Sequence, residues 1–275
     1  MDHSGAKLGG NNKENMSKMP TLLEMLKAGV HFGHQKSRWH PKMEQYIFGV
    51  RNGVHIIDLE KTQEQLDKSL NYVKNLVSKG QVILFVGTKR QAREITKAAA
   101  ISCGMPYLVE RWIGGLLTNF DEVKRRLKKY HNLKEMFATG EIEKYTKKEQ
   151  VTMKKQLEKL DKYLIGLTTL DKMPDALYIA DMRTEKTALA EAERTEVPTV
   201  AVCDTNVNPE KVSYAIPAND DAVNSIKMIA DMVAEAVNEG KKEFDKKKLE
   251  RAKEEPAKRD AVKIEKRALK KEESV

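Results

Sequence analysis

Short apolar runs alternate with segments of helical periodicity along most of the 275-residue chain, and this alternation constrains the fold most strongly. The run Val82-Ile-Leu-Phe-Val86 has no polar interruption, which is typical of a strand buried in a parallel sheet. Strands that alternate with helices form parallel sheets with right-handed crossovers. We therefore predict an α/β fold, a flavodoxin-like doubly wound parallel sheet of about five strands. The predicted strands span 81–87, 107–109, 175–180, 199–203 and 213–216, and the predicted helices span 59–79, 90–104, 185–196 and 220–239.

Residues 118–168 replace this alternation with two longer helical patterns. Thr146 and Glu149 have capping-box spacing at the start of the second pattern, and the short turn 138–141 makes the two helices antiparallel neighbours. From Lys124 to Lys162 there are 13 Lys/Arg against 6 Asp/Glu, so we predict an inserted, positively charged, coiled-coil hairpin. Its predicted apolar seam consists of Phe120, Val123, Leu127, Tyr130, Leu133 and Phe137 on the first helix, and Val151, Leu157, Leu160, Leu164 and Leu167 on the second.

The hairpin separates two segments of one domain, and an extension follows at each end. Met16 is a second plausible start, so the residues before it are expected to be a dispensable leader. The C-terminal extension carries 14 Lys/Arg and 9 Asp/Glu and has no aromatic residue after Phe244, so it is poorly suited to forming a core. The expected organisation is a disordered leader over 1–15, an α/β globular domain over 16–117 plus 169–240, the inserted basic hairpin over 118–168, and a basic tail, disordered or a frayed helix, over 241–275.

Two smaller patterns precede the first long apolar run. The segment 21–29 is predicted to be a short capped helix. The turn Asn52-Gly53, between the apolar runs 46–50 and 54–58, is the strongest short-range signal of a β-hairpin. We expect the short helix to bury a stripe formed by Leu22, Leu23 and Leu26.

The formal net charge of +9 points to a polyanionic partner such as nucleic acid. No apolar run approaches the ~20 residues of a membrane span, and the N-terminus lacks the order of a secretory signal. Cys103 and Cys203 lie in or beside apolar stretches, and there is no Cys-x-x-Cys. We therefore expect buried free thiols and a reducing cytoplasm.

A loop from His31 to Lys42 interleaves cations, imidazoles and aromatic rings. Such groups contact phosphates and stack on the exposed bases of irregular RNA. In a purely structural interpretation, Phe32 and Trp39 pack into the core instead. We expect Phe32 in the core, with Arg38 and Lys42 facing outward.

A metal site is the competing interpretation of the same loop. His31 and His34 would be ligands, and Asp204 or Asp181 would supply oxygen after folding. Two histidines three residues apart are a weak signal, so RNA contact is the favoured interpretation.

The turn Gly87-Thr88-Lys89-Arg90-Gln91 offers a phosphate one glycine, two cations and a helix N-terminus. Together with Asp204, this turn supports an alternative function, a nucleotide-dependent α/β enzyme. The chain has no Gly-x-Gly-x-x-Gly, no Gly-x4-Gly-Lys-Ser/Thr and no Gly-x-Ser-x-Gly, which counts against an enzyme. A third alternative is a protein-docking scaffold whose hairpin binds another protein.

The segment Arg111-Trp112-Ile113-Gly114-Gly115 leads into the hairpin. The paired glycines permit unusual backbone angles and close packing. We expect a tight joint with Trp112 buried, while Arg111 remains a candidate for RNA contact.

Nine motifs occur in order along the chain. They are Ala28-Gly-Val-His-Phe-Gly-His-Gln35, Trp39-His-Pro-Lys-Met43, Tyr46-Ile47, Arg51-Asn-Gly-Val-His-Ile-Ile-Asp-Leu59, Phe85-Val-Gly-Thr-Lys-Arg-Gln-Ala92, Arg111-Trp-Ile-Gly-Gly-Leu-Leu-Thr-Asn-Phe120, Pro174-Asp-Ala-Leu177, Asp204-Thr-Asn206 and Ile216-Pro-Ala-Asn-Asp-Asp-Ala222. In this order, the chain resembles the bacterial small-subunit ribosomal protein S-two (uS-two) family over about 19–239. One departure is Ala218, where the family usually has glycine.

The resemblance implies an α/β domain with a protruding coiled-coil hairpin and no enzymatic activity. It implies a structural constituent of the small ribosomal subunit (30S), in the cytoplasm, that supports translation. It further implies binding to small-subunit ribosomal RNA (rRNA) at the head-body junction, and help in docking the mRNA-binding ribosomal protein S-one. Some family members have a proposed zinc pocket at that contact, for which His34, Asp181 and Asp204 are the matching residues here; no other cofactor is implied.

The expected rRNA contacts are the polar and cationic side chains of the loop 31–42, the turn 87–91, the segment 111–115 and the hairpin 118–168. The sequence leaves open which nucleotides are contacted, whether a metal is bound, whether the tail orders on binding, and whether translation starts at Met1 or Met16. The predicted rRNA-binding residues are His31, Gln35, Lys36, Arg38, Lys42, Arg51, Lys89, Arg90, Arg93 and Arg111 in the domain, and Lys124, Arg125, Arg126, Lys128 and Lys129 on the hairpin.

Overall fold

A five-stranded parallel sheet forms the centre of the protein in the computed structural model, which describes residues 19–272. The strand order is β5-β4-β6-β7-β8, so the chain starts inside the sheet, adds one strand on one side and then the remaining strands on the other. This order is the predicted flavodoxin-like topology. The strands are β4 (Ile83–Val86), β5 (Tyr107–Leu108), β6 (Ala176–Ile179), β7 (Thr199–Cys203) and β8 (Tyr214–Pro217).

Helices cover both faces of this sheet, because alternate strand residues point to opposite faces. Phe85 and Tyr178 lie in one apolar core with α2, α3 and α7, whereas Leu84 and Leu177 lie in a second core with α6 and the start of the hairpin. Both cores are predicted by the uninterrupted apolar runs. The helices are α2 (Leu59–Val77), α3 (Arg93–Ser102), α6 (Lys186–Arg194) and α7 (Val223–Glu272).

Helix α1 (Leu22–Ala28) begins at Thr21 with a capping box that includes Glu24. Its apolar stripe does not face the core as predicted. Met25 is only 1% exposed and packs against the domain, whereas Leu23 is 70% exposed, and Leu22 and Leu26 are exposed as well. A helix of seven residues turns one narrow side inward, and Met25 occupies that side, so the prediction of three buried leucines was wrong.

A second, antiparallel sheet has the order β1-β3-β2 and follows α1. Asn52 and Gly53 both have positive φ, which is the geometry that a two-residue hairpin requires, and the predicted hairpin is present. The predicted loop from 31 to 42 instead contains β1, and Phe32 on this strand is 50% exposed rather than in the core. The strands are β1 (Phe32–Gln35), β2 (Ile47–Arg51) and β3 (Val54–Ile57), with the short 3-10 helices η1 (Lys36–Arg38) and η2 (Pro41–Tyr46) between β1 and β2.

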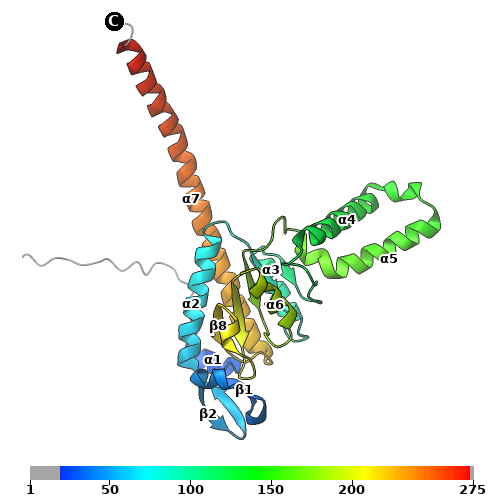
Figure 1. Cartoon of the computed structure of the whole chain (residues 1–275), viewed down its shortest axis with the longest axis vertical. Coiled ribbons are helices and arrows are strands. Elements are labelled where there is room, and N and C mark those ends of the chain that lie inside the picture. Colours follow the sequence, from blue (N-terminus) through cyan, green and yellow to red (C-terminus); the bar gives the residue numbers. More distant parts are fainter. Residues whose placement is uncertain (1–18, 273–275) are drawn as a thin grey trace, which may run out of the picture.

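Helices α4 (Phe120–Thr139) and α5 (Lys147–Leu164) project together from one side of the domain (Figure 1). We call this pair the arm. The Thr146 capping box starts α5, and the Tyr130 hydroxyl donates a 2.5 Å hydrogen bond from α4 to Asp161 on α5. Val151 is 54% exposed, so it is not part of the seam as predicted. The 3-10 helices η3 (Glu141–Lys144) and η4 (Ile165–Leu167) follow α4 and α5 respectively.

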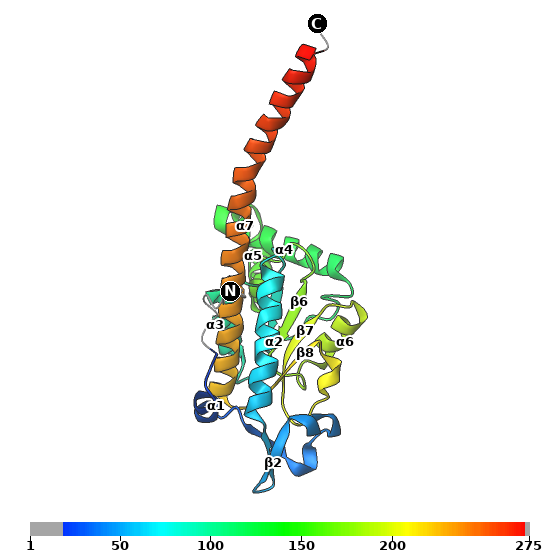
Figure 2. The same ribbon diagram turned by 90° about the vertical axis from the view of Figure 1, so that its left-hand side faces the viewer.

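Helix α7 runs beside α2 and continues past the domain (Figure 2). Lys74 on α2 forms ion pairs with Glu239 at 3.3 Å and Glu243 at 2.9 Å on α7. The helical backbone of α7 therefore extends into the segment that we expected to be a disordered or frayed tail. The predicted leader over 1–15 lies outside the described residues.

Among residues 19–272, no helix has both the length and the apolar character that a membrane span needs.

Candidate functional site

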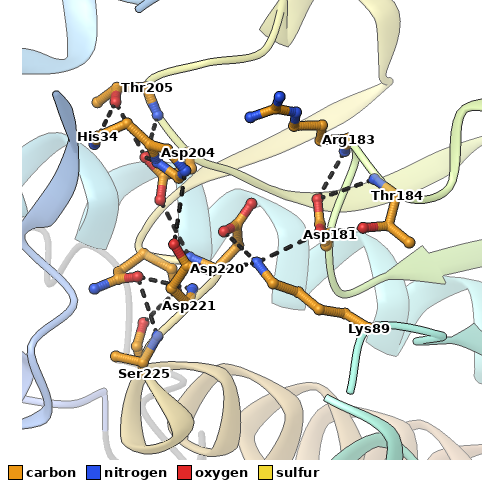
Figure 3. A network of polar contacts seen from close by, with 12 residues as sticks. His34, Lys89, Asp181, Arg183, Thr184, Asp204, Thr205, Asp220, Asp221 and Ser225 are labelled. Carbon is orange, nitrogen blue, oxygen red and sulfur yellow. Dashed lines mark hydrogen bonds and ion pairs between the residues drawn. The ribbon is translucent and has the colours of Figure 1, made fainter. Parts of the chain in front are cut away.

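The carboxyl ends of the parallel strands carry a network of charged side chains, shown in Figure 3. Lys89, which follows β4, places its Nζ 2.6 Å from Asp220 Oδ1, 2.8 Å from Asp221 Oδ1 and 3.4 Å from Asp181 Oδ2. Asp181 follows β6, and Asp220 and Asp221 follow β8. The ammonium group is thus enclosed by carboxylates from two other strand ends.

His34 on β1 joins the second sheet to this network. Its Nδ1 lies 2.9 Å from Asp204 Oδ1, and its backbone N–H donates a 2.8 Å hydrogen bond to the Thr205 hydroxyl. Asp204 also accepts a hydrogen bond of 2.5 Å from the Thr205 N–H. The histidine therefore fixes how the two sheets meet.

Burial raises the pKa of Asp220 to about 7, and the neighbouring charges of Asp181 and Asp204 add to the rise. Burial alone would lower the pKa of Lys89, but its hydrogen bonds with Asp220 and Asp221 raise it above the ordinary value. The hydrogen bond with Asp204 raises the pKa of His34. Lys89 is consequently a permanent cation that compensates part of the carboxylate charge.

The structure brings together only part of the residue set that the resemblance implies for a zinc pocket. His34, Asp204 and Asp220 each bring one donor atom within 4.8 Å of the others, but Asp181 is not in this group. The Asp181 carboxylate accepts hydrogen bonds from the Arg183 and Thr184 N–H groups. The Lys89 ammonium lies 2.6 Å from Asp220 and 3.4 Å from Asp181, so these two carboxylates already have a cation of the protein's own, whereas Asp204 is paired with His34.

The turn after β4 is closed to a phosphate. The Thr88 N–H, which would face a phosphate, donates a 2.8 Å hydrogen bond to the Glu185 carboxylate. A Cβ at Gly87 would lie 2.4 Å from the Thr96 hydroxyl, so this glycine allows close helix packing rather than ligand approach. Lys89 points inward and pairs with carboxylates, so this turn does not supply the phosphate contacts that the hypothesis of a nucleotide-dependent enzyme required.

The other predicted contact residues fall into two groups. Arg93 donates a 2.9 Å hydrogen bond to the Thr88 carbonyl oxygen and pairs with Glu110, so it supports the turn. His31 is half-buried, and its ring contacts the Phe32 ring at a tilt of 38°. Lys42 is exposed but pairs with Glu210 at 2.8 Å. The exposed residues are Gln35, Lys36, Arg38, Lys42, Arg51, Arg90 and Arg111 in the domain, and Lys124, Arg125, Arg126, Lys128 and Lys129 on α4.

The base of the arm is held by one buried carboxylate on α6. Glu191 accepts hydrogen bonds from the Trp112 indole at 2.9 Å and from the backbone N–H groups of Gly115 and Leu117 at 2.9 and 3.1 Å. These bonds fix the segment that enters α4. Trp112 is buried, as predicted, and Arg111 beside it is exposed.

Sequence reasoning missed a second concentration of cations beside the network. Arg183, Lys186 and Lys211 line one groove with Arg38, although they come from separate parts of the chain. No local motif joins them, so only the fold brings them together. One signal was available: Lys186 lies in the first turn of α6, where a cation opposes the helix dipole.

The fold and the site together define a class of protein: a flavodoxin-like α/β domain whose first turn is closed to phosphate and from which a cationic arm projects. The family model for ribosomal protein S2 matches residues 25–240, and the chain belongs to this family. The small ribosomal subunit protein uS2 of Coprothermobacter proteolyticus is 48% identical over 221 residues, which cover 80% of this chain and 82% of that protein.

The family relationship confirms the predicted resemblance. The chain is a structural constituent of the small ribosomal subunit, in the cytoplasm, and it is not an enzyme. The nucleotide-dependent enzyme that we kept as an alternative is therefore wrong.

Proposed function

We propose that the chain binds small-subunit rRNA at the head-body junction and that the arm makes the principal electrostatic contact. The observation that carries this proposal is the cationic surface of α4, where Lys124, Arg125, Arg126, Lys128 and Lys129 are all exposed. Glu122 pairs with Arg125 and Arg126 at 3.2 and 3.4 Å and leaves the cations in excess. Lysine and arginine side chains on an exposed helix neutralise phosphates and release counterions.

The fixed base of the arm supports the same proposal. Because Glu191 holds Trp112, Gly115 and Leu117, the arm leaves the domain in one direction. A pre-positioned cationic helix loses less conformational freedom on binding than a mobile one. We assign further phosphate contacts to exposed domain residues, and leave out Lys89 and Arg93 because their charges have internal partners.

Docking of the mRNA-binding ribosomal protein S-one is a finer proposal that rests on the family resemblance. An exposed apolar surface supports a protein contact of some kind: Leu26, Phe32, Phe48 and Val50 line one groove, and Phe48 is 79% exposed. Exposed apolar patches on soluble proteins commonly mark such contacts.

Gradient sedimentation tests the rRNA proposal. Tagged wild-type chain is expected in the small-subunit peak at moderate salt, whereas Arg125→Glu/Arg126→Glu/Lys129→Glu should reduce that recovery by about tenfold or more, since three phosphate contacts are reversed. The matched control Lys27→Glu/Lys79→Glu/Lys227→Glu makes the same charge change at exposed lysines away from the arm. Equal recovery of the arm variant, the control and the wild type would contradict the proposal.

A further inference from the structure

A groove of about 800 Å³ lies between η1, the start of α6 and the segment after β7. Arg38 lines it from η1, Arg183 and Lys186 line it from the start of α6, and Lys211 lines it from the 3-10 helix η5 (Pro209–Lys211). Glu193 is the acidic residue among its lining side chains. Four Lys/Arg against one carboxylate make the groove a place for an anion.

The groove also has an apolar floor. Met182, Leu189 and Val207 line it, and all three are buried in the domain core. Its volume falls within the range of about 300–1,000 Å³ that small-ligand pockets occupy. Charged walls over an apolar floor suit a ligand that has an anionic part and a flat apolar part.

Asn206 supplies a polar group that the fold leaves unused. Its Nδ2 and Oδ1 atoms are buried and have no hydrogen-bond partner among the described residues, and the residue lines the groove. Its neighbours are engaged: Asn208 caps η5, and Asp204 accepts a hydrogen bond from Thr205. An amide with a free donor and a free acceptor matches the edge of a nucleobase, which is read by paired hydrogen bonds.

The helix dipole does not favour Lys186 at its place in α6. It lies in the first turn of α6, which contains no acidic residue, so its charge opposes the helix dipole. The Arg183 backbone N–H donates to Asp181, while its guanidinium has no contact with the other residues drawn in Figure 3. Both residues line the groove.

We propose that this groove binds one unpaired nucleotide of RNA, with the base against the apolar floor and Asn206, and the phosphates on Arg38, Arg183, Lys186 and Lys211. Unpaired bases offer both their flat faces and their hydrogen-bonding edges, and RNA readers use both. A purely acidic peptide such as polyglutamate would satisfy the cations but has no flat apolar part to lie against the floor. The inference rests on the proposed rRNA function and adds a site away from the arm.

The test measures binding of a fluorescein-labelled single-stranded RNA decamer to the full chain by anisotropy at several salt concentrations. The arm variant Arg125→Glu/Arg126→Glu/Lys129→Glu serves as the background, because it reverses three of the proposed phosphate contacts of the arm. Lys186→Ala/Lys211→Ala is expected to weaken binding about tenfold and to reduce the salt slope by about 1.4, the value for two phosphate contacts. Asn206→Ala should weaken binding at least about fivefold without changing the slope, and Lys79→Ala/Lys227→Ala is the matched control.

A second readout locates the base. Irradiation of the same decamer carrying 4-thiouridine should attach it to peptides that contain 182–189 or 204–211. Attachment only elsewhere, equal binding by all groove variants and the control, or full displacement of the RNA by an equal concentration of polyglutamate would overturn the inference. If the wild type still sediments with small subunits in that case, the groove inference alone fails; if it does not sediment with them, the rRNA proposal fails.

Discussion

The indole Nε1 of Trp112 donates a 2.9 Å hydrogen bond to the buried carboxylate of Glu191, and this bond joins the entry of the arm to α6. Burial opposes the negative charge, but the hydrogen bonds from Trp112 and from the Gly115, Leu117 and Thr118 N–H groups hold the pKa of Glu191 below its ordinary value. One carboxylate thereby satisfies donors that would otherwise be buried without partners.

We expect Glu191→Ala to lower the free energy of unfolding by about 3 kcal/mol, because buried donors lose a charged acceptor. Chemical denaturation measures this loss. Glu193→Ala, on the exposed side of the same helix, should change stability by less than about 0.5 kcal/mol. Similar values for the two variants would mean that Glu191 does not anchor the arm.

Gly166 marks the other end of the arm, where η4 returns to the domain. A Cβ at this position would lie 2.2 Å from the Tyr107 carbonyl oxygen, which belongs to β5 and cannot move aside. We expect Gly166→Ala to lower the free energy of unfolding by about 2 kcal/mol or more.

Gly114 is the matched control, because a Cβ there would meet no atom within 4 Å. Gly114→Ala should leave the thermal midpoint almost unchanged. If Gly166→Ala and Gly114→Ala had the same thermal midpoint, the close contact between Gly166 and the Tyr107 carbonyl oxygen would be contradicted.

Lys89→Met removes the cation that lies between Asp181 and Asp220. Breaking a buried ion pair costs about 3–5 kcal/mol, because the remaining charges stay buried without a partner. Urea denaturation at pH 8 should show this loss, and Asp220→Asn in the same chain should restore part of it. Arg90→Met, one residue away and exposed, is the control; equal stability of both single variants would contradict an internal role for Lys89.

The raised pKa of Asp220 predicts how stability depends on pH. Its folded-state pKa of about 7 lies above the unfolded value near 3.9, so the folded state binds the proton more tightly. Its contribution to stability is full below about pH 4 and decreases as the pH rises to about 7. The raised pKa of His34 acts in the same direction at higher pH, since its contribution is lost as the pH rises through the folded-state value.

Denaturation of wild type and Asp220→Asn between pH 4 and pH 8 checks this sign. The free energy of unfolding of the wild type should fall with rising pH relative to that of the variant. Asp231→Asn, at an exposed carboxylate on α7, should follow the wild type. A difference between wild type and Asp220→Asn that does not change with pH would contradict the burial of this carboxyl.

Much of the fold follows from local sequence. The uninterrupted run 83–86 predicts a strand covered on both faces, and Asn52-Gly53 predicts a hairpin because only such residues adopt its backbone angles readily. Thr146 and Glu149 define a helix start that depends on no distant residue. These features are encoded within a few residues of each other.

The wrong predictions have two physical causes, which are a short helix with only one inward side and contacts between segments far apart in the chain. Leu22 is exposed because Met25 takes the inward side of the short helix α1, and Phe32 is exposed on β1, an edge strand of the antiparallel sheet. Lys89 looks like a phosphate ligand until the fold brings it to Asp220, 131 residues further along the chain. The groove cations Arg38, Arg183, Lys186 and Lys211 share no local motif, because only the fold brings them together.

The most direct test of the rRNA proposal is crosslinking from the arm in purified small subunits. A photoreactive group placed at residue 128 or 155 reports what lies against the arm. We expect that most of the crosslinked product contains small-subunit rRNA and is sensitive to ribonuclease. Crosslinks from both positions to ribosomal proteins alone, with no RNA attached, would contradict it and favour a protein-docking arm.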